Sequence, residues 1–378
     1  MSQDRPLLSV VVPVRNAASS LPKSLKALLS SDFPRRHWEL IVVDDGSADA
    51  SVSIAGAFAD TIVRLPTTES DRGLGAPYSR NRGFEMSRAE IVVFVDPDIE
   101  VATDALRRFW ELLTREEKIG AVSGRLADPP HEATAIRKIA LLRLLHDHES
   151  LGNDTAEFFL RLGAIRSSLL SELELFNEWQ AGYPAAEMAE VAERIRFRGY
   201  SVVQHPEIRG NCLRPWTFRD LIGDSLRDAG TPWTTSQTPT RRFPPSRAAT
   251  HRNRQRISEL LSWIVVACAA LALATDATAL WQRALLASIT GLILLRLSFY
   301  IRVTRSQGAL AIPAAALDVF ALQASGIARL RASVLRAIIG PPRPDATTEA
   351  FAEVGVETWP PVPARRYPPR SSSSVTIN

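Results

Sequence analysis

The stretch IVVFVDPDIE, from Ile91 to Glu100, places two acidic side chains, Asp96 and Asp98, directly after a run of apolar residues. An unbroken run of Ile, Val and Phe is typical of a strand that is buried on both faces of a parallel sheet. In open α/β sheets, ligands bind just beyond the carboxyl ends of the strands. The stretch therefore predicts a buried strand whose end carries two carboxylates into a binding crevice.

Strand-like and helix-like segments alternate on both sides of this stretch. Strands are predicted at 7–14, 39–47 and 61–65, and helices at 18–31, 48–59, 78–89 and 103–114. This alternation predicts an α/β fold with a doubly wound, mostly parallel sheet. Between residues 120 and 200 the pattern is weaker, and AEMAEVAERIRF (186–197) is its clearest helix. The α/β domain is expected to occupy residues 1–230.

The composition changes after this domain. Residues 231–256 are rich in Pro, Thr and Arg and predict a linker, and two apolar segments follow within 257–302. A membrane span needs roughly 20 apolar residues, so these segments predict a transmembrane hairpin, with a buried soluble hairpin as the alternative. Residues 303–340 mix apolar residues with Arg and predict an amphipathic interfacial helix or a packed helix. The Pro- and Ser-rich residues 341–378 predict a disordered tail.

The charges around the hairpin predict its orientation. Arginines flank both outer ends of the pair, and the short connection between the segments carries only Asp276. By the positive-inside rule, both outer ends face the cytoplasm. Arg283 and Arg296 lie within the second segment and are expected to extend toward the headgroups. We therefore expect an inner-membrane or plasma-membrane protein with its α/β domain in the cytoplasm.

Composition also limits the function classes. The net charge is +4 and the pI about 9.3, but the first half contains no dense basic block, so a nucleic-acid partner is not expected. Two cysteines, Cys212 and Cys268, cannot make a disulfide framework. MSQDRPLLSV lacks the charged and apolar regions of a signal peptide.

Polar residues follow three of the predicted strands. The first strand ends in Pro13, Arg15 and Asn16, the second in DDGS (44–47), and a later one in Asp96 and Asp98. Two carboxylates spaced one residue apart can hold Mn²⁺ or Mg²⁺, and the cation can bridge the oxygens of a diphosphate. The alternative for each motif alone is a solvated turn, because Asp and Gly are common in turns. Their order on successive strands favours the binding site.

The chain resembles the family 2 glycosyltransferases, which have the GT-A fold. The resemblance covers residues 7 to about 220 and is carried by SVVVPVRNAASSLPKSLKALLSSDFPRRHWELIVVDDGSADAS (9–51) and APYSRNRGFEMSRAEIVVFVDPDIEV (76–101), which includes the Asp-x-Asp motif. It implies that Asp96 faces the ribose and the metal and that Asp98 binds the metal. Residues 163–170 resemble the segment that lines the acceptor side of the active site in this family. The residues expected at the nucleotide are Pro13, Arg15, Asn16, Asp45, Arg80 and Asp96.

The resemblance is incomplete at the catalytic base. The family commonly has Gly-Glu-Asp at the start of a late helix, and counting back from Tyr200 places Glu187 and Met188 at the last two positions. Glu187 is therefore the predicted base, with Glu190 as a weaker candidate and a first-turn helix carboxylate as the alternative for Glu187. Non-processive relatives often carry a His where this chain has Cys212.

The resemblance, taken together with these features, implies an inverting, metal-dependent hexosyltransferase of cell-envelope glycan synthesis. It would move one sugar from a nucleotide sugar, with a UDP-sugar as the default, to a hydroxyl acceptor. A lipid-linked or membrane-delivered glycan acceptor is expected because of the hairpin. NCLRPW (211–216) does not match the Gln-x-x-Arg-Trp of processive synthases.

Two alternative functions remain open. One is a degenerate relative that binds a nucleotide sugar or a partner without turnover, and the other is a GT-A-like nucleotidyltransferase.

The segment HDHE (146–149) has the composition of a metal cluster, but no further ligands with zinc spacing accompany it, so a polar loop is expected there.

Overall fold

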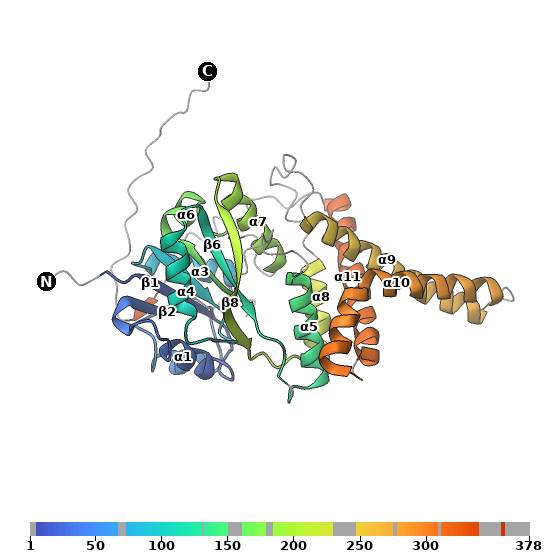
Figure 1. Cartoon of the computed structure of the whole chain (residues 1–378), viewed down its shortest axis with the longest axis horizontal. Coiled ribbons are helices and arrows are strands. Elements are labelled where there is room, and N and C mark those ends of the chain that lie inside the picture. The colour runs from blue at the N-terminus through green and yellow to red at the C-terminus, as the bar shows by residue number, and fades with distance from the viewer. Residues whose placement is uncertain are drawn as a thin grey trace, which may run out of the picture.

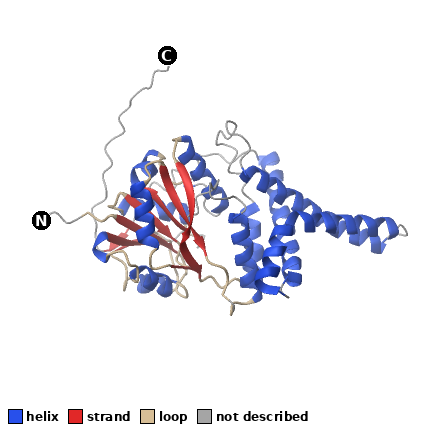
Figure 2. Ribbon diagram, viewed as in Figure 1, coloured by secondary structure: helices blue, strands red, loops and turns tan. Residues whose placement is uncertain are grey.

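The computed structural model describes residues 5–66, 73–130, 132–149, 161–178, 184–229, 247–274, 278–308, 311–339 and 357–359. Figures 1 and 2 show a sheet with its helices in one half of the molecule and a group of long helices in the other. The paired ends of the helices at 247–274 and 278–307 extend away from the rest of the described residues, at the right of Figure 1. The predicted division into an α/β part and a helical C-terminal part is therefore visible in the structure.

The described elements have the following bounds. The strands are β1 (Leu8–Val14), β2 (Trp38–Asp44), β3 (Thr61–Arg64), β4 (Ile91–Val95), β5 (Ile99–Val101), β6 (Ile119–Leu126), β7 (Leu162–Arg166), β8 (Ser201–Cys212) and β9 (Glu357–Trp359). The helices are α1 (Leu21–Leu29), α2 (Ser51–Ala55), α3 (Ala76–Met86), α4 (Ala105–Arg115), α5 (Ala135–Glu149), α6 (Ser167–Glu172), α7 (Pro184–Phe197), α8 (Phe218–Ala229), α9 (Arg247–Ala274), α10 (Thr278–Gln307) and α11 (Ala311–Ile339).

Among these residues the strands form one sheet in the order β5-β8-β6-β7-β4-β1-β2-β3-β9. β3, β2, β1 and β4 run parallel to one another, as the alternating pattern predicts. The other half of the sheet is mixed: β7 is antiparallel to β4 and β6, whereas β6 and β8 are parallel. The predicted α/β fold is confirmed, with an antiparallel portion that the sequence pattern did not indicate.

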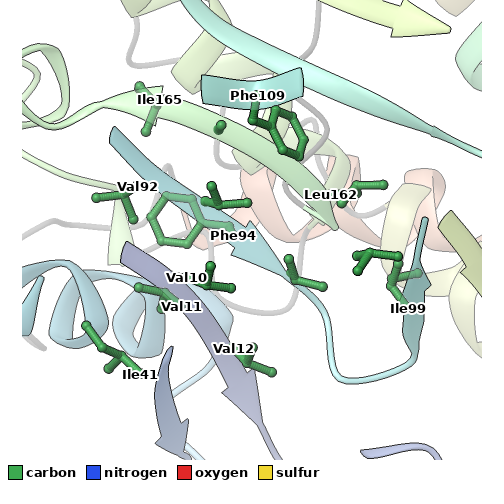
Figure 3. Packing of buried hydrophobic residues seen from close by; sticks show 14 of the residues in the cluster. Val10, Val11, Val12, Ile41, Val92, Phe94, Ile99, Phe109, Leu162 and Ile165 are labelled. Atoms are coloured by element: carbon green, nitrogen blue, oxygen red, sulfur yellow. The ribbon is translucent and has the colours of Figure 1, made fainter. Parts of the chain in front are cut away.

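The apolar runs fold as strands because both of their faces are covered. Every residue of β1, β2 and β4 is buried, as expected for strands between two layers of helix. Figure 3 shows Val10 of β1, Phe94 of β4 and Phe109 of α4 within this core. Each fully buried side chain of this size contributes about 1.5–3 kcal/mol. This core fixes the strand ends on which the site is built.

The antiparallel strands bring distant residues to the end of β4. β5 pairs with the end of β8, so that Ile99 lies opposite Cys212. Residues 163–170, which were expected to line the acceptor side, form most of β7 and the start of α6. Gly163 and Ala164 lie between β4 and β6 and are buried. This segment is therefore largely part of the core.

The C-terminal half contains the predicted helical hairpin. α9 and α10 pack against each other. They include stretches long and apolar enough to cross a membrane, Arg254–Ala274 and Ala279–Ser306, with mean hydropathies of 2.1 and 1.9. In each stretch only 22% of the most apolar window is buried, whereas a core helix of a soluble protein is mostly buried. The exposed apolar surface therefore favours the membrane hairpin over the buried one.

α11 is a packed helix along at least one face. It contacts α8, α9 and α10, and Ser325 Oγ donates to the backbone oxygen of Ser225 in α8 (3.2 Å). Another part of its surface exposes Phe320, Ile327 and Leu330. A packed helix, one of the two alternatives for 303–340, is therefore present at 311–339, and an interfacial position for its exposed apolar side stays a prediction. α9 begins at Arg247, inside the predicted linker, and residues 230–246 lie outside the described part.

Two expectations about the C-terminal region differ from the structure. Arg296 was expected to extend toward the headgroups, but it is buried and forms an ion pair with Asp318 of α11, Nη2 to Oδ1 at 2.7 Å. The predicted disordered tail is wrong at residues 357–359, which form β9 beside β3. β3 would otherwise be the edge of the sheet with unpaired backbone groups, and Thr and Trp favour strands. The rest of 341–378 lies outside the described residues.

Candidate active site

Asn16 joins the loops that follow β1 and β2. Its backbone N–H donates to Ser47 Oγ (3.0 Å), and its side-chain oxygen accepts from the Ala48 N–H (2.8 Å). Its φ of 48° lies in the left-handed region, which Asn adopts more readily than most residues. Asn16 thus holds the two loops together. Pro13, which was also expected at the nucleotide, is buried within β1.

Asp45 directly follows β2, and the loop at residues 73–75 encloses its carboxylate. The Leu74 and Gly75 amides donate to Oδ1 (2.7 Å) and Oδ2 (2.9 Å), and Arg15 Nη1 donates to its backbone oxygen (2.9 Å). Gly73 has a φ of 69°, and a Cβ there would collide with Arg15 and the Asp45 carboxylate. Burial raises the pKa of Asp45, although the two amides act in the opposite direction. Each carboxylate oxygen keeps a second lone pair for a ligand.

Backbone hydrogen bonds fix the turn after β4. The Asp96 N–H donates to the backbone oxygen of Arg161 (2.9 Å), and the Leu213 N–H donates to that of Asp98 (2.7 Å). The carboxylates therefore stand between the start of β7 and the end of β8. Their side chains are 18% and 17% exposed, so a ligand can reach them at this end of the sheet.

Arg80 connects Asp96 to the predicted base. It lies on α3 and is buried. Its Nη1 donates to Glu187 Oε1 on α7 (2.7 Å), and its Nη2 donates to Asp96 Oδ1 (3.2 Å). The structure thus brings three of the predicted site residues into one chain of contacts. Arg15 and Asp45 lie at the N-terminal end of the same α3 helix.

Glu187 has the environment of a strengthened base. Its side chain is 3% exposed, and burial raises its pKa above the ordinary value, while the charge of Arg80 opposes that shift. A carboxylate with a raised pKa holds a proton more firmly once it has accepted one. The contact with Arg80 fixes its position opposite Asp96.

The neighbouring candidates on α7 have other surroundings. Met188, at the position where the family commonly has Asp, belongs to the hydrophobic core. Glu190 is paired with Arg194 one turn later (Nε to Oε1, 2.8 Å). Neither side chain forms a hydrogen bond or ion pair with Arg80, Asp96 or Asp98 among the described residues.

Cys212 stands where non-processive relatives often have a histidine. The residue is buried beside the Asp98 turn, and burial raises the pKa of its thiol to about 12. A thiol binds metals as the thiolate, whereas a histidine binds them as the neutral imidazole. The position is therefore chemically different from that of a histidine.

Asp96 and Asp98 nevertheless offer ligands that suit a divalent cation. In the described part of the chain, no group of three or more His, Cys, Asp or Glu residues is arranged to hold a metal. Oδ1 of Asp98 is, however, buried without a hydrogen-bond partner there. Hard cations prefer carboxylate oxygens and take further ligands from water and substrate phosphates. Two carboxylates with a free buried oxygen fit such a shared site.

Sequence reasoning missed two arginines that face Asp98. Arg161 precedes β7 and lies within 4 Å of both carboxylates. Arg214 lies after β8, and its Nη1 is 3.1 Å from Asp224 on α8. No motif marks Arg161, and Arg214 was considered only in a comparison with processive enzymes. Their placement depends on the antiparallel strands.

The HDHE segment lies away from this site. His146 is on α5, its ring is 5.6 Å from that of Phe299, and it lies 3.5 Å from Ser298 Oγ, both on α10. The side chains of residues 147–149 are outside the described part. His146 therefore belongs to the contact between α5 and the hairpin.

Comparison with known proteins gives consistent matches to sugar-transferring enzymes. Residues 9–165 match the family described as Glycosyl transferase family 2. Glycosyltransferase AglE of Haloferax volcanii is 36% identical over 98 residues, which cover 26% of this chain and 32% of that protein. Undecaprenyl-phosphate 4-deoxy-4-formamido-L-arabinose transferase of Shewanella sediminis is 32% identical over 101 residues, or 26% of this chain and 30% of that protein. The chain thus spans about a third of the length of these two relatives.

A solved structure shares the fold over a longer range. The mannosyltransferase PcManGT of Pyrobaculum calidifontis, determined with GDP-Man and Mn²⁺, superposes with a TM-score of 0.57. The match covers 86% of this chain and 87% of that one, at 22% sequence identity. It shows that the chain has the architecture of a GT-A enzyme.

Proposed function

The chain belongs to glycosyl transferase family 2 through residues 9–165, and from this premise we propose that it is an inverting transferase that moves one sugar from a nucleotide sugar to a hydroxyl acceptor. The observation that carries the proposal is the contact chain Glu187–Arg80–Asp96 at the carboxyl end of β4. It joins a strengthened base to a residue expected at the nucleotide and metal.

Glu187 is proposed as the general base. The acceptor oxygen attacks the anomeric carbon as the bond from that carbon to the diphosphate oxygen breaks. The hydroxyl proton passes to the Glu187 carboxylate, and the nucleoside diphosphate leaves with the bonding electrons. Because attack and departure take place on opposite faces of the sugar, the anomeric configuration inverts. Removal of such a base typically costs about 10²–10⁴ in rate.

Asp96 and Asp98 are proposed to hold Mn²⁺ or Mg²⁺. The bound cation would neutralise charge on the departing diphosphate. Asp45 and Arg15 are proposed to bind the nucleoside, and the remaining acceptor capacity of the Asp45 carboxylate beyond the end of β2 supports this role. Backbone hydrogen bonds fix the turn that carries Asp96 and Asp98, so the two carboxylates would need little rearrangement to bind the cation.

The acceptor is proposed to be lipid-linked or delivered by the membrane. α9 and α10 expose apolar surface, and α8, which follows the site in sequence, packs against α11 beside them. A hairpin in the bilayer would hold the crevice close to such an acceptor and raise its effective concentration. The Shewanella sediminis relative is named for undecaprenyl phosphate, which supports this class of acceptor.

The proposed orientation places the catalytic domain at the cytoplasmic face of the inner or plasma membrane. Its test is a Thr278→Cys variant in a chain with Cys212 and Cys268 replaced. An impermeant thiol reagent should label it in whole cells. A cysteine at Ser246 should stay unlabelled, and labelling only at Ser246 would invert the orientation. Extraction of the protein by salt alone would exclude the spanning hairpin.

A binding screen tests the proposed donor site. The full chain in detergent is titrated with UDP, GDP and dTDP and their sugars, once with Mn²⁺ and once with a chelator. We expect tight binding of one base and loss of that binding with the chelator. If the chain bound none of these nucleotides, it would not contain the proposed donor site.

A second candidate is a relative that binds a nucleotide sugar without turning it over. The burial of Met188 in the core favours it, because the position of the family's usual base then carries no proton acceptor. In that case the parent transfers no sugar, and Met188→Asp is the change expected to restore transfer. A GT-A-like nucleotidyltransferase would be revealed by release of pyrophosphate.

A further inference from the structure

Arg161 occupies the space between the two carboxylates of the Asp-x-Asp motif. Its Nε lies 3.9 Å from Asp96 Oδ2, and its Nη1 lies 3.8 Å from Asp98 Oδ2. The side chain is 21% exposed. The residue immediately precedes β7, and its backbone oxygen accepts the Asp96 amide, so its main chain is fixed beside the motif.

The side-chain contacts of Arg161 are ionic but loose. Hydrogen bonds between nitrogen and oxygen are about 2.7–3.2 Å long, and both of its contacts exceed that range. Arg80, in the same crevice, reaches its two carboxylates at 2.7 and 3.2 Å. Oδ1 of Asp98 also has no partner among the described residues. Arg161 therefore compensates the charge of the motif and leaves its oxygen atoms available.

Arg161 remains a cation in this position. Burial lowers its pKa, but the charges of Asp98 and Asp96 outweigh burial and raise the pKa above that of a free arginine. Arg214 is nearby but is held by Asp224 of α8 at 3.1 Å, at hydrogen-bond distance. Of these two arginines, Arg161 is the one whose carboxylate contacts are loose enough to be exchanged.

We propose that Arg161 is the counter-ion that a divalent cation displaces from Asp96 and Asp98, and that the displaced guanidinium then binds the diphosphate of the donor. The inference rests on the proposed function and assigns a role to a residue outside the family motifs. A divalent ion and a guanidinium cannot both stay within 4 Å of the same carboxylates without strong repulsion. The incoming diphosphate supplies new partners, since a guanidinium pairs with phosphate oxygens through two parallel hydrogen bonds.

This exchange would couple the two ligands. In the absence of nucleotide, Arg161 competes with the cation and weakens its binding. When the diphosphate is present, it draws Arg161 away and completes the cation's oxygen ligands. The crevice would therefore bind cation and diphosphate together more tightly than either alone.

The test measures Mn²⁺ binding to the full chain in detergent without nucleotide, from the electron paramagnetic resonance signal of free Mn²⁺. Arg161→Gln removes the competing charge, so Mn²⁺ should bind about tenfold more tightly than in the parent, a usual size for coupling between sites. In saturating Mn²⁺, the same variant should bind the nucleoside diphosphate about tenfold more weakly. Arg209→Gln is the control, because Arg209 is an exposed arginine on β8 and its removal changes the net charge equally.

Arg161→Lys provides a second variant that does not depend on folding of the glutamine form. Lysine keeps the charge but lacks the planar guanidinium that makes two parallel hydrogen bonds to phosphate. Mn²⁺ affinity should therefore stay near that of the parent, while diphosphate affinity should fall. Equal Mn²⁺ affinities for the parent, Arg161→Gln and Arg209→Gln would overturn the proposal. So would diphosphate binding that is the same with Mn²⁺ and with a chelator, since Arg161 would then be a permanent substitute for the cation. These binding measurements need no sugar transfer. If they gave the expected results while the chain transferred no sugar from any donor, only the proposed function would be contradicted.

Discussion

The carboxyl end of β4 and the helical half each bury carboxylates against arginines, and the two clusters differ in how completely they are bonded. Asp318 of α11 accepts from Arg296 Nε (3.0 Å) and Nη2 (2.7 Å) and from the Tyr300 hydroxyl (3.2 Å). Arg143 of α5 lies 3.6 Å away. At the end of β4, Asp98 has one loose contact with Arg161 and one oxygen without a partner among the described residues.

The difference separates a structural cluster from a binding cluster. The Asp318 cluster joins α5, α10 and α11, and its bonded geometry suits a fixed contact between the α/β domain and the hairpin. The Asp98 cluster keeps free oxygen atoms at an accessible sheet edge. Changes in the crevice should therefore affect rate and binding, and changes at Asp318 should affect stability.

Glu187→Gln should have the largest effect. The amide preserves size and most hydrogen bonding but cannot accept a proton. Transfer should fall by roughly two to four orders of magnitude, while nucleotide-sugar affinity and the unfolding midpoint change little. The measurement is single-turnover transfer together with equilibrium donor binding.

Glu190→Gln is the matched control for this change. Glu190 lies one turn along the same helix and is paired with Arg194, so its loss should be far milder for transfer. If Glu187→Gln were as active as the parent, the base would have to be sought elsewhere. Met188→Asp should not fully rescue Glu187→Gln, because its shorter side chain starts from a different position on α7.

Asp98→Ala should abolish metal-dependent binding of the nucleoside diphosphate without unfolding the chain. Its carboxylate makes no described side-chain hydrogen bond, so little of the fold depends on it. Titration with Mn²⁺ and the nucleoside diphosphate, together with thermal unfolding, separates the two effects. Binding as tight as in the parent would show that Asp98 does not hold the cation.

Asp318→Ala should show the opposite behaviour. It removes the carboxylate that pairs with the buried Arg296, and breaking a buried pair in this way typically costs about 3–5 kcal/mol. The thermal unfolding midpoint in detergent should fall clearly. Adding Arg296→Met should recover part of the loss, because an apolar side chain tolerates the buried site. A midpoint like that of the parent would mean that the cluster contributes no stability.

Replacement of Arg80 tests the base through the pH dependence of transfer, apart from the stability that is lost when its buried ion pairs are broken. Burial raises the pKa of Glu187 and Arg80 opposes that rise, so Arg80→Met should raise this pKa further. A base acts when deprotonated, so the acidic limb of kcat/KM should move to higher pH. Arg82→Met, on the same helix but paired with Glu85, should leave the limb in place. If the acidic limb of kcat/KM stayed at the same pH in both variants, Arg80 would have no influence on the pKa of the base.

The parallel half of the fold could be predicted because its signals are local. The runs at β1, β2 and β4 are continuous and apolar, and each ends at polar residues. β7 and β8 were not predicted, because their antiparallel and mixed pairing depends on distant partners. The pairing of β9 with β3 likewise joins residues far apart in the sequence.

The candidate site could likewise be predicted where its signals are local, but not where they depend on the pairing of distant strands. Asp96 and Asp98 follow from a strand end, Glu187 was predicted from the family resemblance, and the structure joins Asp96 and Glu187 through Arg80. Arg161 could not be found, because only the pairing of β4 with β7 brings it to the motif. The role of Arg296 was misjudged for a similar reason: its partner Asp318 is 22 residues away on another helix.

The product released from the donor tests the central claim most directly. Membranes that contain the full chain are incubated with Mn²⁺ and UDP-, GDP- or dTDP-sugars, and the same is done with Glu187→Gln. The account predicts a nucleoside diphosphate from one donor, one sugar transferred with inverted anomeric configuration for each diphosphate, and a large decrease in the variant. Release of pyrophosphate would contradict it, as would a parent that is inactive with every donor while Met188→Asp transfers sugar.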